Sequence, residues 1–459
     1  MNVVMPQLFG TDGIRGIANK PPLDPTTVVR FGQCLVRFQK SRGLDQRTLL
    51  ARDTRISGPM LEAALVAGIC SEGGEPLLAG VLPTPALARM ASYVGCEGVV
   101  ISASHNPWPY NGIKFVGADG FKWSPREEED FEALLRDVGQ ELGVPTGSKL
   151  GGRVGSPQPL PHAAEWYVNS LLQALDGAGS LSGLTIAVDC ANGAAVPVAV
   201  QLFQACGADV TTIGVAPDGY NINDNCGSLF PEQLRNTVLE LGSDAGVAFD
   251  GDADRVALVD ERGSVLDGDQ LLWILARDLD ERGALKRRVV VGTVMSNFGL
   301  ERALARRGIQ LLRTSVGDRF VVEQMREVQA QLGGEPSGHI VWLDHATTGD
   351  GLLTALAVLQ IAVARQRPVS ELCSGLELFP QVQVNVEVPN PRQTLADDAV
   401  QRVVEAARQA LQGVGRLVVR ASGTEPVIRI LLEGENPSAL QLWSERIASQ
   451  VRLASGKAD

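Results

Sequence analysis

The sequence predicts an α/β protein of four domains: three related domains built on βαβ units, followed by a smaller α+β domain. The first observation is a repeated order of apolar strand, small polar turn, amphipathic helix, glycine and second strand. This order occurs at residues 49–79, 185–213 and 289–312. The second observation is the alternation of valines over residues 382–388, which is typical of a strand. At 459 residues the chain is also too long for a single hydrophobic core.

Each copy of the repeated order defines its own elements. The predicted strand, helix and strand of the three copies are 49–51, 60–70 and 76–79, then 185–188, 196–206 and 210–213, then 289–291, 300–307 and 309–312. The copies are unevenly spaced along the chain, which argues against a solenoid of short repeats. They are therefore interpreted as three related α/β domains.

A stretch rich in glycine, proline and serine, a polar turn between apolar runs and the start of the valine alternation mark the expected domain boundaries, in that order. They lie at 143–161, near 261–263 and near 377–380. The predicted domains are therefore 1–155, 156–262, 263–377 and 378–459. Each of them carries one polar loop whose side chains could take part in binding or catalysis, which suggests a central cleft where the four domains meet.

The composition excludes several classes of protein. The net charge of −12 argues against nucleic acid or an anionic membrane as the main partner. The seven cysteines are scattered without a C-x-x-C pair, as expected in a reducing cytoplasm. No apolar run approaches the length of a membrane span, and the first residues lack the pattern of a signal peptide. We therefore expect a cytoplasmic protein that acts on a small molecule.

The loop of residues 102–107 is the first candidate for chemistry. It follows the apolar strand 99–101, at the kind of strand end where α/β folds place ligands. Ser104 offers a hydroxyl on this loop, and Lys114 offers a cation shortly after it. The structural alternative is an ordinary serine and asparagine turn before a proline.

A second candidate is the acidic loop after the apolar strand 246–249. Asp250, Asp252 and Asp254 alternate along it, which crowds negative charge unless a hard cation such as Mg²⁺ compensates it. The segment also matches an EF-hand loop, but Arg255 stands where that loop requires glycine. Arg255 is better interpreted as a phosphate ligand. A solvated acidic turn is the alternative. A hydroxyl together with a magnesium-type site predicts phosphoryl transfer.

Three further loops carry polar side chains that could bind a sugar phosphate, although an ordinary turn is the alternative for each. Residues 334–339 combine a carboxylate, a hydroxyl and an imidazole, which suit the hydroxyls of a sugar. Residues 420–429 bring arginines, hydroxyls and a glycine together, which suits a phosphate dianion. Near the N-terminus, Arg15 lies among glycines and could approach a phosphate.

Taken together and in this order, the loops resemble those of the α-D-phosphohexomutase superfamily over essentially the whole chain. The resemblance also includes residues 9–16, 101–107, 316–319 and 347–351. It implies three α/β domains and a C-terminal domain of TATA-binding-protein-like topology around a central cleft. The likeness is closest to the amino-sugar branch. That branch converts glucosamine 6-phosphate reversibly to glucosamine 1-phosphate through a phosphoserine enzyme and a 1,6-bisphosphate, and so supplies UDP-N-acetylglucosamine synthesis.

The resemblance also implies a role for each candidate residue. Ser104 would be the phosphoserine, and its phosphate would join the three aspartates in holding one Mg²⁺ per subunit. Arg255 and His105 would contact the phosphoserine, and Lys114 or Arg15 would accept the proton of the attacking hydroxyl. The implied substrate-binding residues are Glu335, Ser337, His339, Arg420, Ser422, Gly423, Thr424 and Arg429. A hexose 1,6-bisphosphate would act as activator. A homodimer is a general expectation for a soluble enzyme.

Three alternatives stay open at this stage. Pro336 stands where the amino-sugar branch usually carries glutamine or asparagine, so a phosphomannomutase or phosphoglucomutase of the same superfamily is the first. The second is a magnesium-dependent phosphatase with Asp250 or Asp252 as nucleophile. The third is a calcium- or sugar-phosphate-binding protein without catalysis.

Overall fold

The computed structural model describes residues 8–10, 12–140, 154–422 and 426–456. The chain divides into two compact units. The first unit comprises residues 1–293 and 314–374, and the second comprises residues 294–313 and 375–459. In the described part of the chain, every helix is too short or too polar to cross a lipid bilayer.

The N-terminal part of the first unit is built on a sheet with strand order β1-β5-β4-β2-β3-β6. Its strands are β1 (Ile14–Ile17), β2 (Arg47–Arg52), β3 (Glu75–Val81), β4 (Glu97–Ile101), β5 (Tyr110–Val116) and β6 (Gln158–Pro159). Its helices are α1 (Pro25–Ser41), α2 (Gly58–Ser71), α3 (Thr84–Val94) and α4 (Pro125–Gln140). The predicted strand 49–51, helix 60–70 and strand 76–79 are therefore confirmed. Of the predicted linker, residues 141–153 lie outside the described residues, whereas β6 pairs in parallel with β3.

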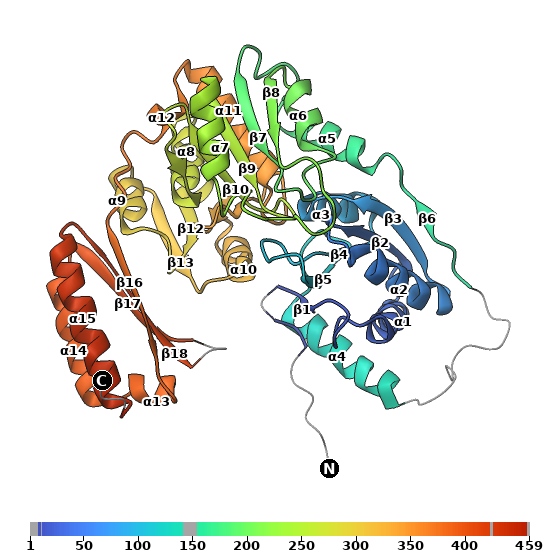
Figure 1. The fold of residues 1–459 in the computed structure, drawn as a ribbon, viewed down its shortest axis with the longest axis horizontal. Helices are drawn as coiled ribbons and strands as arrows, with labels where there is room; N and C mark the ends of the chain where they lie inside the picture. Colours follow the sequence, from blue (N-terminus) through green and yellow to red (C-terminus); the bar gives the residue numbers. More distant parts are fainter. Residues whose placement is uncertain (1–7, 11, 141–153, 423–425, 457–459) are drawn as a thin grey trace. The chain divides into compact units, whose positions relative to one another are not determined.

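Alternation along β4 explains how helices cover both faces of this sheet. Val99 and Ile101 join the buried cluster that includes Phe31 of α1 and Leu65 of α2. Gly98 points to the opposite face, where a side chain would meet Leu87 of α3. Figure 1 accordingly shows α1, α2 and α4 on one face and α3 on the other. The strand β4 is thus buried on both sides, and the loop that follows it starts from a rigid base.

The second sheet of this unit has the order β11-β10-β9-β7-β8. Its strands are β7 (Thr185–Asp189), β8 (Asp209–Ile213), β9 (Ala245–Phe249), β10 (Val256–Asp260) and β11 (Val265–Leu266), and its helices are α5 (Ala163–Ala174), α6 (Ala199–Ala205) and α7 (Glu232–Leu241). The predicted strands 185–188 and 210–213 are confirmed. The helix predicted from 196 begins later, at Ala199. The preceding turn is used differently, because the Ala194 N–H donates to the Gly251 carbonyl at 2.8 Å.

The third part of the first unit contains β12 (Val289–Thr293), β14 (Leu332–Gly334) and β15 (Ile340–Trp342). β12 pairs in parallel with β14, and β14 pairs in antiparallel with β15. The helices are α8 (Gly268–Glu281), α10 (Asp318–Val328), α11 (Gly351–Arg365) and α12 (Val369–Leu372), with a 3₁₀ turn η1 (Lys286–Arg288). The start of α8 is fixed by a capping box between Asp267 and Gln270.

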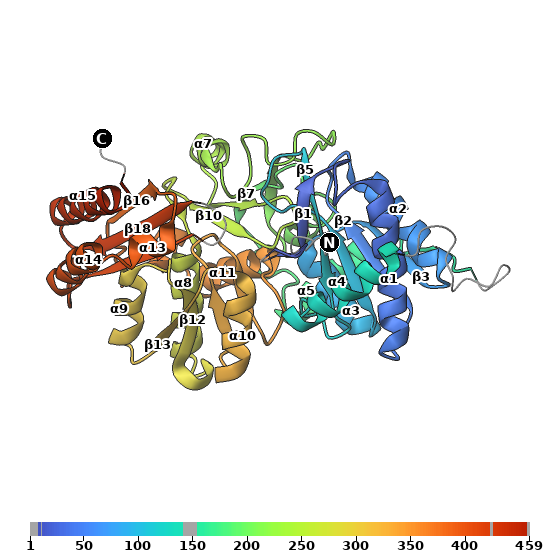
Figure 2. The ribbon, with the colours of Figure 1, turned by 90° about the horizontal axis from the view of Figure 1, so that it is seen from below.

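The second unit holds an antiparallel sheet of order β16-β18-β17. Its elements are α9 (Phe298–Arg306), β13 (Gln310–Thr314, whose last residue belongs to the first unit), β16 (Gln381–Glu387), α13 (Pro391–Leu395), α14 (Asp398–Ala410), β17 (Gly415–Ala421), β18 (Val427–Gly434) and α15 (Pro437–Ala454). Helices α14 and α15 lie side by side on one face of the sheet, as Figures 1 and 2 show. The valine alternation that predicted β16 is confirmed: Val382, Val384 and Val386 lie on the face of the sheet that packs against the helices.

Glu97, the first residue of β4, is a buried carboxyl and leads to a prediction about stability. It is 4% exposed, and it accepts a hydrogen bond from Trp123 Nε1 at 3.1 Å. Burial raises the pKa of Glu97 from 4.5 to about 7. The folded protein therefore binds this proton more tightly than the unfolded chain does, and its stability should fall as pH rises from about 4.5 to about 7.

Replacing Glu97 with glutamine removes this cost of ionisation. We expect Glu97→Gln to raise the free energy of unfolding at pH 8 by on the order of 2–3 kcal/mol, and by much less at pH 5. Urea denaturation at the two pH values measures the difference. The exposed Glu165 provides a control, Glu165→Gln, which should leave both values unchanged. An equal effect of Glu97→Gln at both pH values would contradict the prediction.

Candidate active site

The loop after β4 presents Ser104 in an unusual backbone conformation. The φ angle of Ser104 is 53°, in the left-handed region that non-glycine residues seldom adopt. The residue is 1% exposed, and its Oγ donates a hydrogen bond to Asp250 Oδ2 at 2.6 Å. The neighbouring His105 lies with Nδ1 3.4 Å from the same Oγ. Burial, together with the cations of Arg255 and Arg15, lowers the pKa of His105 to about 4, so the imidazole is neutral at neutral pH.

A buried ion pair on the loop after β2 binds the backbone of residues 102–107, which we call the serine loop. Asp53 and Arg55 are both fully buried, with Arg55 Nε 2.8 Å from Asp53 Oδ2. The guanidinium of Arg55 also donates to the carbonyl oxygens of Ser104, at 2.9 Å, and of Asn106, at 2.7 Å. Asn223 lies between β8 and α7, in the part of the unit built on the second sheet, and its Nδ2 donates to the same Ser104 carbonyl at 2.9 Å. The serine loop is therefore held by two segments distant in sequence.

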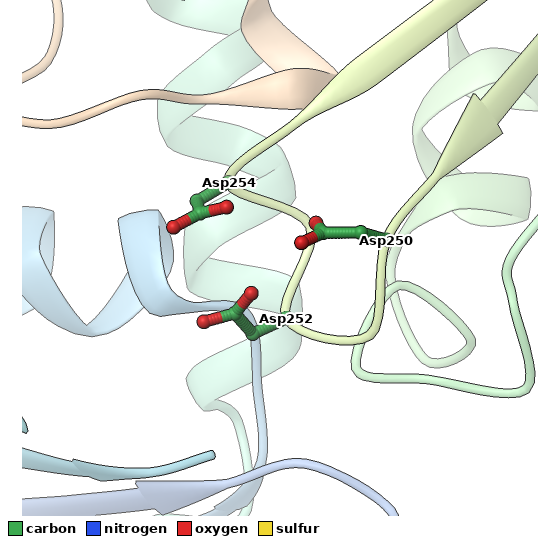
Figure 3. Close-up of side chains that lie close together, drawn as sticks. All are labelled: Asp250, Asp252 and Asp254. Atoms are coloured by element: carbon green, nitrogen blue, oxygen red, sulfur yellow. The ribbon is translucent and has the colours of Figure 1, made fainter. Parts of the chain in front are cut away.

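The loop between β9 and β10 brings three carboxylates together. One oxygen each of Asp250, Asp252 and Asp254 lies within 4.8 Å of the other two, and all three residues are buried. Figure 3 shows these side chains arranged around a common space. Among the described residues, Asp252 Oδ1 and Asp254 Oδ1 have no hydrogen-bond partner. Oxygen donors left over in a buried cluster suit a hard divalent cation.

The electrostatics of the cluster indicate the same need for positive charge. Burial and the nearby carboxylates of Asp254 and Asp252 raise the pKa of Asp250 well above its ordinary value. The pKa of Asp254 is raised as well, by burial and by Asp252. Burial also opposes ionisation of Asp252, but the Lys114 ammonium outweighs it and lowers the pKa. The protein alone thus compensates only part of the negative charge in the cluster.

Lys114, on β5, is buried among carboxylates. Its Nζ lies 2.8 Å from Asp252 Oδ2 and 3.0 Å from Asp12 Oδ2. Burial by itself lowers the pKa of Lys114, but Asp12, Asp252 and Asp254 together raise it. The ammonium form of Lys114 is therefore the stable one in this arrangement. Arg15, on β1, pairs with the same Asp12 and donates to the Ala103 carbonyl at 3.4 Å.

The ion pairs continue from Asp12 to the third part of the unit. Lys122 lies between Asp12 and Asp318, with its Nζ hydrogen-bonded to both. His339 Nε2 lies 3.6 Å from Asp318 Oδ2 and 3.9 Å from an Asp254 carboxylate oxygen. We call this chain of contacts, which comprises Asp252, Lys114, Asp12, Lys122, Asp318 and His339, the charge ladder. It ties the acidic loop to the loop predicted to bind sugar.

That loop forms the turn between β14 and β15. Glu335 is buried, and its Oε1 accepts a hydrogen bond from the Gly317 N–H at 3.0 Å. The turn needs glycine at 338, because φ there is +86° and a Cβ atom would lie 2.0 Å from the Val256 carbonyl oxygen. Among the described residues, the buried Ser337 Oγ and His339 Nδ1 have no hydrogen-bond partner.

In the second unit, the predicted phosphate loop lies between β17 and β18. Arg420 and Arg429 are directly opposite each other in this antiparallel pair. Two like charges at opposed positions are unfavourable unless an anion lies between or near them. The Ser422 N–H donates to the Val427 carbonyl at 2.9 Å and closes the loop. Gly423 and Thr424 lie outside the described residues.

The first unit thus brings most of the predicted site residues together, and adds residues that sequence reasoning missed. The contacts above link Ser104, His105, Arg15, Lys114, the three aspartates and His339. Arg255 adjoins the cluster, since its backbone nitrogen donates a hydrogen bond to Asp250 Oδ1 at 3.3 Å. The residues to which the sequence analysis gave no role are Asp53, Arg55, Asn223, Asp12, Lys122 and Asp318, although Asp12 and Asp318 lie in the motifs 9–16 and 316–319. A signal for Asp53 and Arg55 exists, since they directly follow the predicted strand 49–51, which the structure pairs with the strand that precedes the serine loop.

Comparison with known protein families shows to which family the chain belongs. Models of the phosphoglucomutase/phosphomannomutase family match it in order: α/β/α domain I at residues 6–141, α/β/α domain II at 165–263, α/β/α domain III at 267–379 and the C-terminal domain at 384–450. The chain belongs to this family, and the expectation of three α/β domains followed by a C-terminal domain is confirmed. The boundaries predicted near 155, 262 and 377, and the central cleft, stay predictions.

Individual relatives narrow the assignment within the family. The phosphoglucosamine mutase of Moorella thermoacetica is 47% identical over 98% of this chain and 100% of its own length. That of Geobacillus kaustophilus is 44% identical with the same coverage. Among solved structures, a phosphoglucomutase/phosphomannomutase family protein from Burkholderia thailandensis has the same fold, with a TM-score of 0.79, 24% identity and 98% of both chains covered. Within the family, the chain thus groups with the phosphoglucosamine mutases.

Proposed function

We propose that this chain converts glucosamine 6-phosphate reversibly to glucosamine 1-phosphate, with Ser104 as the residue that carries the phosphoryl group. The observation that carries the proposal is the position of Ser104 Oγ, 2.6 Å from Asp250 Oδ2 at the edge of a buried three-carboxylate cluster. A hydroxyl in that place can exchange a phosphoryl group beside a bound cation. The relatives described above support the amino sugar as substrate.

A divalent cation fits the cluster. Asp250, Asp252 and Asp254 would hold it through carboxylate oxygens, two of which have no hydrogen-bond partner among the described residues. Mg²⁺, one per subunit, suits such a set of hard oxygen donors. The Ser104 phosphate would complete its ligands, and the bound cation would neutralise charge on the phosphoryl group being transferred. Arg255 and His105 would contact that phosphate.

The reaction proposed for this site proceeds in two transfers. First, the C1 hydroxyl oxygen of glucosamine 6-phosphate bonds to the phosphorus on Ser104, and the bond from phosphorus to Ser104 Oγ breaks. The hydroxyl proton leaves to a base, and Oγ takes up a proton. The 1,6-bisphosphate then reorients in the site, and Oγ bonds to the phosphorus at O6 as the bond from that phosphorus to O6 breaks. In this second transfer Oγ gives up its proton to the base, and O6 takes one up to become the C6 hydroxyl. A hexose 1,6-bisphosphate would restore any enzyme that has lost its phosphate and would therefore act as activator.

The binding residues divide between the sugar and the phosphate that is not being transferred. Glu335, Ser337 and His339 would bind the sugar hydroxyls, while Arg420, Ser422, Gly423, Thr424 and Arg429 would hold the phosphate that is not being transferred. Lys114 or Arg15 would accept the proton of the attacking hydroxyl, with Lys114 the first choice. Lys114 is an ammonium ion in its present contacts with Asp252 and Asp12, so it must lose a proton before it can act as the base. We further propose a cytoplasmic homodimer.

Substrate competition tests the choice of sugar. The turnover of glucosamine 6-phosphate, glucose 6-phosphate and mannose 6-phosphate is measured with Mg²⁺ and a trace of the matching 1,6-bisphosphate. We expect glucosamine 6-phosphate to have the largest kcat/KM, by at least about tenfold. The loop is also rebuilt with Pro336→Gln, which restores the residue usual for the amino-sugar branch. A larger kcat/KM for a neutral hexose in the natural chain would contradict the proposal and favour the phosphoglucomutase or phosphomannomutase alternative.

The phosphatase and the non-catalytic alternatives predict different products. A phosphatase with Asp250 or Asp252 as nucleophile releases inorganic phosphate and does not need Ser104. A binding protein without catalysis leaves the sugar phosphate unchanged. ³¹P NMR of a mixture of enzyme, Mg²⁺ and glucosamine 6-phosphate distinguishes all three, because glucosamine 1-phosphate, inorganic phosphate and unreacted substrate give separate signals.

A further inference from the structure

All of the hydrogen-bond donors of the Arg55 guanidinium bind Asp53 or backbone carbonyls in and beside the serine loop. A guanidinium has five N–H donors in a rigid plane. Nε donates to Asp53 Oδ2 at 2.8 Å. The remaining four bonds go to the carbonyl oxygens of Ser104 (2.9 Å), Asn106 (2.7 Å), Pro107 (2.6 Å) and Tyr110 (3.0 Å). A fully buried charge with this many backbone acceptors fixes the course of the loop around it.

The same ion pair also reaches the backbone N–H of Ser104. That N–H donates to Ser102 Oγ at 3.0 Å, and Ser102 Oγ donates to Asp53 Oδ2 at 2.7 Å. Both backbone groups of Ser104 are therefore bound, its carbonyl by Arg55 and its N–H through Ser102 by Asp53. These bonds maintain the left-handed φ of 53°, which an unsupported serine seldom adopts. In this conformation Oγ points at Asp250.

We infer that Arg55 is a positioning residue for phosphoryl transfer: it holds Ser104 in the left-handed conformation that directs Oγ to the metal-type cluster. This inference rests on the proposed function of Ser104. Arg55 acts through the backbone only and touches neither the hydroxyl nor the three carboxylates in any described contact. Its effect should therefore fall on the transfer step, because a misplaced nucleophile slows chemistry more than it weakens substrate binding.

The substitution Arg55→Lys tests the inference. Lysine keeps the charge next to Asp53 but has three donors and no planar fork, so it cannot bind all four carbonyl groups. We expect kcat to fall by about 100-fold, with KM for glucosamine 6-phosphate changed by less than about threefold. The lifetime of ³²P-labelled phosphoserine at position 104 should also shorten, because the loop no longer keeps the phosphate in one place. Arg37, paired with Glu72 on the same domain at 2.9 Å, gives the matched control Arg37→Lys, which should leave all three quantities unchanged.

The outcomes separate this inference from the function on which it rests. If the natural chain itself takes no label on Ser104, the proposed function fails. If the natural chain is labelled and a folded Arg55→Lys keeps its kcat and phosphoserine lifetime, the positioning role is refuted. An equal loss in Arg37→Lys would also refute it. If circular dichroism shows that Arg55→Lys does not fold, the substitution Ser102→Ala tests the inference instead. It removes only the hydroxyl that links Asp53 to the Ser104 N–H. A kcat reduced by about tenfold at constant KM supports the inference, and an unchanged kcat overturns it.

Discussion

Replacing Ser104 with alanine is expected to reduce mutase activity by at least about 10⁴-fold, because the residue that accepts and returns the phosphoryl group is removed. The loss should persist when hexose 1,6-bisphosphate is added in excess, since no residue remains for it to phosphorylate. The fold should survive, because the side-chain bond to Asp250 is the only strong contact given up among those described here for the hydroxyl. Steady-state kinetics with and without the bisphosphate measure the effect.

A second serine of the same domain controls for the substitution itself. Ser71 ends α2, and its hydroxyl bonds the Gly68 carbonyl within its own helix at 2.8 Å, so Ser71→Ala should keep normal turnover. Intact-mass measurement after incubation with the bisphosphate should show one added phosphoryl group on the natural chain and on Ser71→Ala. Ser104→Ala should gain none. Turnover near the natural rate in Ser104→Ala would favour an aspartate nucleophile instead.

The acidic cluster gives the second large effect. Asp254→Asn removes one charged ligand, and we expect kcat/KM to fall by on the order of 10³-fold at a Mg²⁺ concentration that saturates the natural enzyme. Asp254 is the informative choice because its Oδ1 has no described hydrogen-bond partner, so little else is lost. The exposed Asp224 supplies the control, Asp224→Asn, which should leave activity unchanged.

Thermal stability provides a readout of the cation that does not depend on activity. For the natural chain, Mg²⁺ at about 100 times its Kd should add about 2.7 kcal/mol to the free energy of unfolding, and a chelator should reverse this. Asp254→Asn should lose most of that gain. Without metal it should be at least as stable as the natural chain, because burial and the repulsion from Asp252, which together raise the pKa of Asp254, no longer act on a charged group. If Mg²⁺ stabilises both proteins equally, Asp254 is not a ligand.

Much of the fold could be predicted because hydrophobic periodicity is a local property. The strand 185–188 and the valine alternation over residues 382–388 can both be recognised from a few residues. The late start of α6 could not be predicted, because the turn at Ala194 binds Gly251, a residue of a different loop. Local patterns carry no information about such long-range backbone bonds.

The candidate site was predictable where its residues stand close together in sequence. Asp250, Asp252 and Asp254 form one short motif with a clear chemical reason. Arg55 and Asn223 were missed because their partners are carbonyl groups, which every residue possesses and no sequence pattern marks. Only the folded chain shows which carbonyls they bind, and the same holds for the pairing of Arg420 with Arg429 across two strands.

The charge ladder has a consequence for how this enzyme could change over generations. Each of its two lysines lies between two aspartates from different segments, as Lys122 does between Asp12 and Asp318. Losing either lysine leaves two buried carboxylates with less compensation, so a single substitution at Lys114 or Lys122 is harmful where a concerted pair would be tolerated. Positions more than 100 residues apart are therefore expected to vary together, and divergence at this site should proceed by paired replacements instead of independent drift.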